Sequence, residues 1–209
     1  MDVMEEQTVI TQDVIDNAFT YKEYVDYVDK LYEEGTTTSG HDSEAMLHYT
    51  QLNQHRMKRL ERTAKLDEKL VDYLQNLDTP MIWLVITEGW CGDAAQNLPL
   101  LHKMEEASDK VEMRLILRDQ NLEIMDQYLT NGGRSIPKLI ALKKDTLEEL
   151  GTWGPRPAPA QELFLKAKND DSVNKQEIAK DIQKWYAKDR SRTLQMEMLE
   201  NLVRWNSDK

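Results

Sequence analysis

The sequence predicts an α/β fold in which a mixed central sheet is flanked by helices and carries helical extensions at both ends. Two observations predict it. The apolar spacing is helical in the first and last thirds of the chain and changes to short apolar runs in the middle. The middle segments then follow in the order β-α-β-α-β-β, which combines a helical crossover with a hairpin.

Composition is that of a folded, acidic protein. The chain has 209 residues, of which 40% are hydrophobic and 31% charged, and this balance is typical of globular rather than disordered chains. The length suits one domain with additions or two small domains. A net charge of -11 repels phosphate backbones, so nucleic acid is not an expected partner.

The expected location is the cytoplasm. The first residues show neither a basic segment nor an apolar stretch of the kind that makes a signal peptide. The longest apolar run, residues 81–86, is too short to span a bilayer, so no membrane association is expected. The sequence holds a single cysteine, which excludes a disulfide within one chain.

Residues 1–78 are expected to form an N-terminal helical extension packed on the core. Thr20 and Glu23 have capping-box spacing at the start of a first helix. Residues 35–40 read as a turn or loop. Between residues 43 and 77 the chain contains no proline and no glycine, and its apolar spacing predicts one long amphipathic helix.

Residues 79–168 are expected to hold the sheet, and residues 169–209 a C-terminal helical extension. Asn174 and Glu177 are candidate caps of a final helix that can run on to Leu202. The core elements are expected as strands at 81–86, 111–117, 138–142 and 147–153, and as helices at 92–107, 122–129 and 161–168.

One motif carries chemistry. Residues 90–94 read Trp-Cys-Gly-Asp-Ala and lie between the first strand and the following helix. Free amides and the dipole at a helix start stabilise an anion, so the pKa of Cys91 is expected to be lowered and its thiolate enriched. The thiolate is the nucleophile in disulfide exchange.

The motif and its surroundings resemble the thioredoxin superfamily. That family has Trp-Cys-Gly-Pro-Cys at this place, a proline where Pro99 stands, and an Ile-Pro pair where Ile136 and Pro137 stand. The match covers about residues 80–165 and is closest to bacterial thioredoxin-like proteins with Trp-Cys-Gly-Asp, Asn-Gly-Gly-Arg-Ser-Ile-Pro and Gly-Thr-Trp-Gly-Pro-Arg-Pro. The resemblance implies a thioredoxin-like fold with a cis-proline facing Cys91.

The departures from the family pattern decide the expected chemistry. Ala94 stands where the family has its resolving cysteine, and the buried aspartate of the family would fall near Val85. Cys91 can therefore attack a disulfide, but a second molecule must release the product. The candidates are glutathione, another low-molecular-weight thiol, a partner's cysteine, or Cys91 of a second chain.

The remaining site residues follow from the resemblance and from charge. The substrate groove is expected at Trp90, Gly92, Asp93, Ile136 and Pro137. Asp93 would oppose a thiolate at Cys91, and Glu88 would add to this effect. Arg134 is expected to supply the compensating charge, whereas Arg156 is interpreted as a loop anchor.

Two functions remain open. The first is monothiol thiol–disulfide exchange through Cys91 with an external thiol. The second is a non-catalytic thioredoxin-fold binding or adaptor module, in which Cys91 is a buried small hydrophobe. The expected partners are proteins or low-molecular-weight thiols and disulfides, and the amphipathic extensions leave a homodimer open. No cofactor and no metal site is expected, because no cysteine and histidine share metal-ligand spacing.

Overall fold

A computed structural model describes residues 9–40, 43–168 and 174–206. A four-stranded mixed sheet with the order β2-β1-β3-β4 lies at its centre. The strands are β1 (Met81–Thr87), β2 (Val111–Leu117), β3 (Lys138–Lys143) and β4 (Glu149–Trp153). β1 pairs in parallel with β2 and antiparallel with β3, and β4 is antiparallel to β3. The predicted fold class is confirmed.

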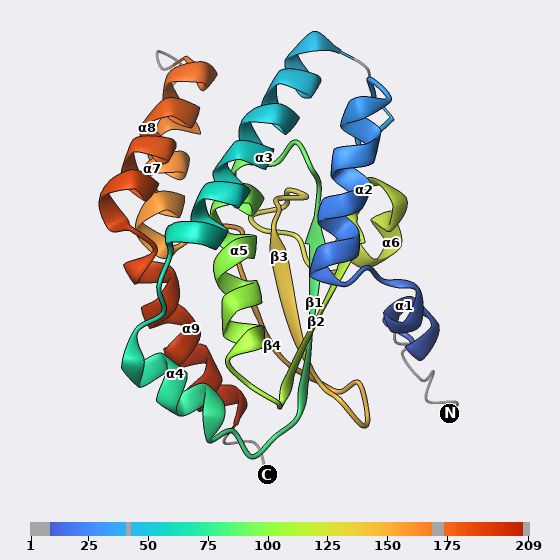
Figure 1. Cartoon of the computed structure of the whole chain (residues 1–209), viewed down its shortest axis with the longest axis vertical. Helices are drawn as coiled ribbons and strands as arrows, with labels where there is room; N and C mark the ends of the chain where they lie inside the picture. Colours follow the sequence, from blue (N-terminus) through green and yellow to red (C-terminus); the bar gives the residue numbers. More distant parts are fainter. Residues whose placement is uncertain (1–8, 41–42, 169–173, 207–209) are drawn as a thin grey trace.

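Helices cover the sheet and extend beyond it (Figure 1). They are α1 (Gln12–Asn17), α2 (Tyr21–Glu33), α3 (Glu44–Thr63), α4 (Glu68–Gln75), α5 (Gly92–Glu106), α6 (Leu122–Met125), α7 (Ala158–Lys168), α8 (Lys175–Asp189) and α9 (Arg192–Trp205), with a short 3-10 turn η1 (Arg118–Gln120). Figure 1 shows α5 in front of the sheet, with α3 beside it and α7 to α9 along one flank.

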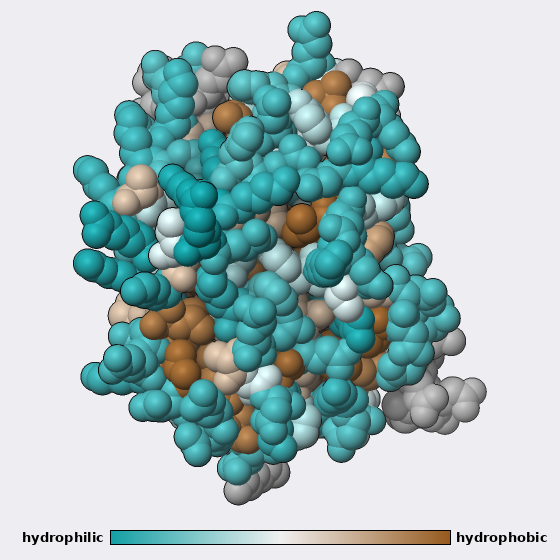
Figure 2. All heavy atoms as spheres, in the orientation of Figure 1, coloured by the Kyte–Doolittle hydropathy of each residue, from teal (hydrophilic) through white to brown (hydrophobic). Residues whose placement is uncertain are grey.

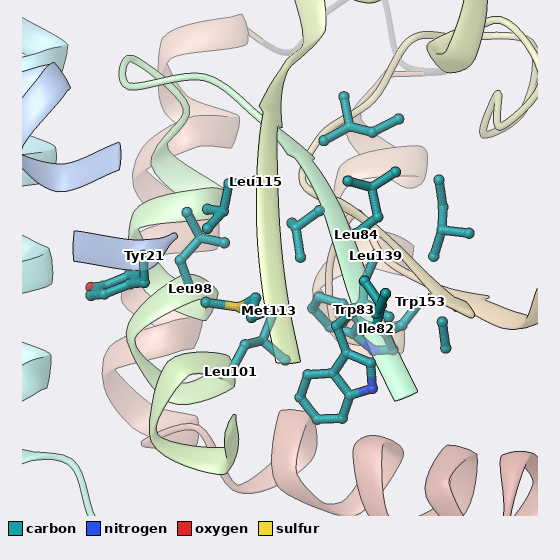
Figure 3. Close-up of a cluster of buried hydrophobic side chains, with 14 of the residues drawn as sticks. Tyr21, Ile82, Trp83, Leu84, Leu98, Leu101, Met113, Leu115, Leu139 and Trp153 are labelled. Atoms are coloured by element: carbon teal, nitrogen blue, oxygen red, sulfur yellow. The ribbon is translucent and has the colours of Figure 1, made fainter. Parts of the chain in front are cut away.

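The core forms around the central strand. All seven residues of β1 are buried, as expected for a strand with a neighbour on each side and helices over it. Figure 3 shows Leu98 and Leu101 of α5 beside Met113 and Leu115 of β2. This packing holds α5 against the sheet.

Two predicted helices are broken in the structure. The helix expected over residues 43–77 ends at Thr63 and restarts as α4, because the side chain of Asp67 caps the new helix by accepting the amide of Lys69 at 3.0 Å. The helix expected to reach Leu202 is interrupted at Arg190 and Ser191, whose φ angles of 53° and 60° are left-handed.

The other element boundaries differ by a few residues. α6 is shorter than the expected 122–129, β4 begins at residue 149, and α7 begins at residue 158 rather than 161. Pro159 lies in the first turn of α7, where its missing N–H costs no helical hydrogen bond.

Helices of both predicted extensions contact the sheet domain, although the division at residues 78 and 168 stays a prediction. Asn206, just after α9, accepts the amides of Asp78 and Thr79 at 3.0 and 3.1 Å. α9 also contacts β4, and α3 packs on α5. Among the described helices, none has the length and apolar character needed to cross a membrane.

The surface is mostly hydrophilic in the view of Figure 2, where apolar atoms gather over the region of α4 and α9. Met196 and Val203 of α9 are 56% and 46% exposed. The C-terminal helix α9 therefore exposes apolar side chains to solvent.

Candidate functional site

Cys91 lies at the junction between β1 and α5 and is the N-cap of that helix. Its sulfur accepts the amide of Ala94 at 3.5 Å, and its thiol donates to the carbonyl oxygen of Ile136 at 3.3 Å. The residue is only 7% exposed. The thiol therefore bridges the helix start to the loop before β3.

That loop is held at close range to the segment after β4. The Ile136–Pro137 peptide bond is cis, and Pro137 is buried. Gly154 has a φ of 110°, and a Cβ at this position would meet the carbonyl oxygen of Pro137. Only glycine fits this approach, because it lacks the Cβ and accepts the positive φ.

An open cleft of about 330 Å³ lies at Cys91. Its lining consists of Trp90, Cys91, Gly92, Asp93, Arg118, Arg134, Ser135, Ile136 and Arg156. The structure therefore brings together all the sequence-predicted site residues except Pro137, which is buried next to Ile136. The catalytic and groove roles assigned from the sequence stay predictions.

Asp93 forms the centre of a buried polar network. Its Oδ2 lies 2.8 Å from Nε of Arg156, and the two side chains are 12% and 10% exposed. Tyr186 of α8 donates its hydroxyl hydrogen to Oδ1 of Asp93 at 3.0 Å, and Asn97 donates to the Tyr186 hydroxyl at 3.0 Å. Burial raises the pKa of Asp93, and the charge of Arg156 opposes that rise.

The thiol of Cys91 is protonated at neutral pH. Burial, followed by the charge of Asp93, raises its pKa to about 12, while the amides at the helix start and Arg156 act in the opposite direction. The expected lowering of this pKa is therefore wrong. The helix start does stabilise the anion, but loss of solvation outweighs it once the side chain is buried.

Arg134 lines the cleft at Cys91, and its charge is paired with a carboxylate outside the lining. It forms an ion pair with Asp126 at 2.6 Å, and both side chains are nearly half exposed. Arg156 is the arginine that contacts Asp93 and favours the charged thiolate. The charge-tuning role expected of Arg134 stays a prediction, and Arg156 is an arginine with this effect that the sequence did not indicate.

The N-terminal helices hold the other side of the motif. Asn53 of α3 donates to the carbonyl oxygen of Gly89 at 3.0 Å, and the amide of Gly89 donates to Thr38 at 3.1 Å. Glu88 is fully buried, accepts the hydroxyl of Thr38, and accepts the amide of Asp119 at 2.9 Å. Burial raises the pKa of Glu88.

The sequence did not indicate that Arg118 lines the cleft or that Tyr186 contacts Asp93. It indicated Arg156 only as a loop anchor, whereas the structure also pairs Arg156 with Asp93. Arg118 directly follows β2, which is parallel to β1, so both strands end at the same edge of the sheet. The parallel pairing expected from the β-α-β order could therefore have placed Arg118 near the residues that follow β1. Nothing in the local sequence of Tyr186 marks it, since its role depends on how α8 packs against α5.

Comparison with a family model supports the fold. A family model described as Thioredoxin matches residues 39–187. Two solved structures are similar: an HIV epitope-scaffold, with 18% identity, a TM-score of 0.49 and coverage of 89% of this chain and 97% of that chain, and a protein of unknown function from Pseudomonas aeruginosa, with 20% identity, a TM-score of 0.46 and coverage of 86% and 99%. No curated protein matches this chain.

Proposed function

Since this chain belongs to the thioredoxin family, we propose that it is a non-catalytic binding module whose cleft at Cys91 holds a ligand or a partner segment without disulfide exchange. The state of the thiol carries this proposal. Cys91 is buried, donates to Ile136, and has a pKa near 12. A neutral thiol is a weak nucleophile, so the cleft is available for binding while Cys91 is unsuited to the thiol–disulfide exchange of the family.

The absence of a second thiol supports the same proposal. The sequence contains one cysteine, and Ala94 is buried at the position of the resolving thiol. Val85 is also buried and offers no proton acceptor where the family has its aspartate. The sequence therefore lacks the second thiol that the release step of a dithiol cycle needs, and Val85 cannot accept a proton.

Reaction of Cys91 with glutathione disulfide tests the proposal. Mass spectrometry follows the mixed disulfide, since Cys91 is the only cysteine of the chain. We expect the folded protein to react far more slowly at pH 8 than the same chain unfolded in urea. A folded-state rate equal to or above that of the unfolded chain would reject a non-catalytic role.

Monothiol exchange through Cys91 is the second candidate. The specific observation in its favour is the N-cap position of Cys91, where the amide of Ala94 points at the sulfur in a cleft open to solvent. In that case Cys91 attacks a disulfide, one sulfur leaves as a thiol, and an external thiol later regenerates Cys91. Fast, reversible glutathionylation in the test above is the outcome that favours it.

We also propose a family relationship, a cellular location and an oligomeric state for this protein. The Trp-Cys-Gly-Asp-Ala motif supports a relationship with bacterial thioredoxin-like proteins that share it, and a cytoplasmic location agrees with the single cysteine. A homodimer through the helical extensions would use exposed apolar residues such as Met196 and Val203. Sedimentation of the wild type and of Met196→Asp would detect such a dimer and its loss.

A further inference from the structure

We infer that the cleft at Cys91 is a recognition site for a small anionic ligand bearing carboxylate or phosphate groups, bound by Arg118, Arg134 and Arg156. This inference rests on the proposed binding function and names its ligand class. All three arginines line the cleft, against a single lining carboxylate, Asp93.

The described residues that line the cleft include more basic than acidic side chains, unlike the protein as a whole. The chain has a net charge of -11, so an anion is repelled by most of the surface. Arg118 is positioned by Asp119 at 2.8 Å and stacks over Trp90 at 4.8 Å. Arg134 is positioned by Asp126. Neither aspartate is among the residues that line the cleft.

The guanidinium groups keep donors for a ligand. In the hydrogen bonds among the described residues, Arg118 uses Nε and Nη1, Arg134 uses Nε and Nη2, and Arg156 uses Nη1. At least one nitrogen of each group has no hydrogen bond within that part of the chain. Planar guanidinium groups match carboxylate and phosphate oxygens in pairs, which makes an oxyanion the fitting ligand.

One buried polar atom of the lining adds a further observation. In the described residues, four buried side-chain nitrogen or oxygen atoms have no hydrogen-bond partner, and two of them are Nε1 of Trp90 and Nε of Arg156. Nε of Arg156 has Oδ2 of Asp93 as its ion-pair partner at 2.8 Å, so Nε1 of Trp90 is the donor among the cleft residues that lacks an acceptor. A buried donor without an acceptor is unusual in native proteins, and a bound ligand is one way to supply the acceptor.

Size favours a small molecule over an acidic protein segment. A volume of about 330 Å³ lies at the lower end of small-molecule sites. The ordered side chains around it also reduce the entropic cost of binding, because Arg118 and Arg156 are each held by an ion pair and by an aromatic ring.

The experiment measures anion binding through the Trp90 indole. The Nε1–H signal of Trp90 is assigned by comparison with Trp90→Phe and followed by NMR during titration of the full chain. Citrate supplies carboxylates, inorganic phosphate supplies a phosphoryl group, and glycerol is the neutral probe. A hexaglutamate peptide represents an acidic protein segment.

We expect saturable binding of citrate or phosphate, none of glycerol, and weakening by salt. Arg118→Gln and Arg134→Gln should each lower the affinity by about tenfold or more. Arg204→Gln on α9 makes the same change in charge outside the cleft and should leave the affinity unchanged. The difference between citrate and phosphate identifies the preferred oxyanion.

Three results would overturn the inference: no saturable binding of either anion at millimolar concentration, equal loss in Arg204→Gln, or binding of hexaglutamate tenfold tighter than citrate. None of these bears on the reactivity of Cys91, which the glutathione disulfide reaction measures separately. Conversely, fast exchange at Cys91 would reject the non-catalytic role while anion binding persists.

Discussion

Replacing Arg156 by Met should destabilise the protein strongly, because it leaves the carboxylate of Asp93 buried without its cation. The two side chains are 10% and 12% exposed and lie 2.8 Å apart. Breaking a buried ion pair from one side costs about 3–5 kcal/mol. Urea slopes of about 1–3 kcal/mol per molar for small proteins turn this into a midpoint shift of roughly 1–5 M.

The assay is urea unfolding at pH 7, followed by the fluorescence of the five tryptophans. Arg134→Met is the matched control, since its ion pair with Asp126 is nearly half exposed on both sides and should contribute less than about 1 kcal/mol. The double variant Arg156→Met with Asp93→Asn removes the unpaired charge and should recover about 1 kcal/mol or more.

The pH dependence of the loss follows from the same pair. Without Arg156, Asp93 can escape its unfavourable charge by binding a proton, and burial already raises its pKa. The destabilisation should therefore shrink as the pH is lowered from 7 to 5. The reasoning would be refuted by an Arg156→Met loss no larger than that of Arg134→Met, or by a double variant less stable than Arg156→Met alone.

Three further predictions concern neighbouring groups. Asp93→Asn should raise the rate of iodoacetamide alkylation of Cys91 at pH 8 by about tenfold, because the carboxylate opposes the thiolate; an unchanged rate contradicts this. Glu88, whose pKa is raised by burial, binds its proton more tightly when folded, so stability should fall as the pH rises above the usual glutamate range. Thermal melts at pH 5 and 8 should show a smaller fall for Glu88→Gln. Gly154→Ala should cost several kcal/mol by urea unfolding, since its Cβ would meet a backbone carbonyl, whereas Gly132→Ala, with a φ of 73° and open space, should cost only about 1 kcal/mol for its backbone strain.

The elements with strong local signals could be predicted from the sequence. The apolar run at residues 81–86 became the fully buried strand β1, and Cys91 took its expected place at the start of α5. Asp67 is a local signal for the helix break within residues 43–77, since aspartate is a favoured N-cap. The break at Arg190 has a weaker signal, because both halves keep helical spacing and the N-cap residue Ser191 makes no side-chain cap hydrogen bond.

The electrostatics of the site could not be predicted, because they depend on contacts between distant segments. Asp93 meets Arg156 and Tyr186, which lie 63 and 93 positions further along the chain. The burial of Cys91 likewise results from the packing of loops and helices from both ends of the chain around residues 88–93. A local motif predicts where the thiol stands, whereas its protonation depends on these long-range neighbours.

The packing of α8 bears on how often water reaches the start of α5, close to the Cys91 thiol. Ile178, Ile182 and Tyr186 form a small apolar cluster with Phe164 and Trp185, separate from the main core. Such a unit can open by local unfolding at a lower free energy than the whole domain requires. Each opening would withdraw Tyr186 from Asp93 and admit water to the start of α5. Where such openings expose Cys91, the rate of its alkylation would report how often α7 and α8 open.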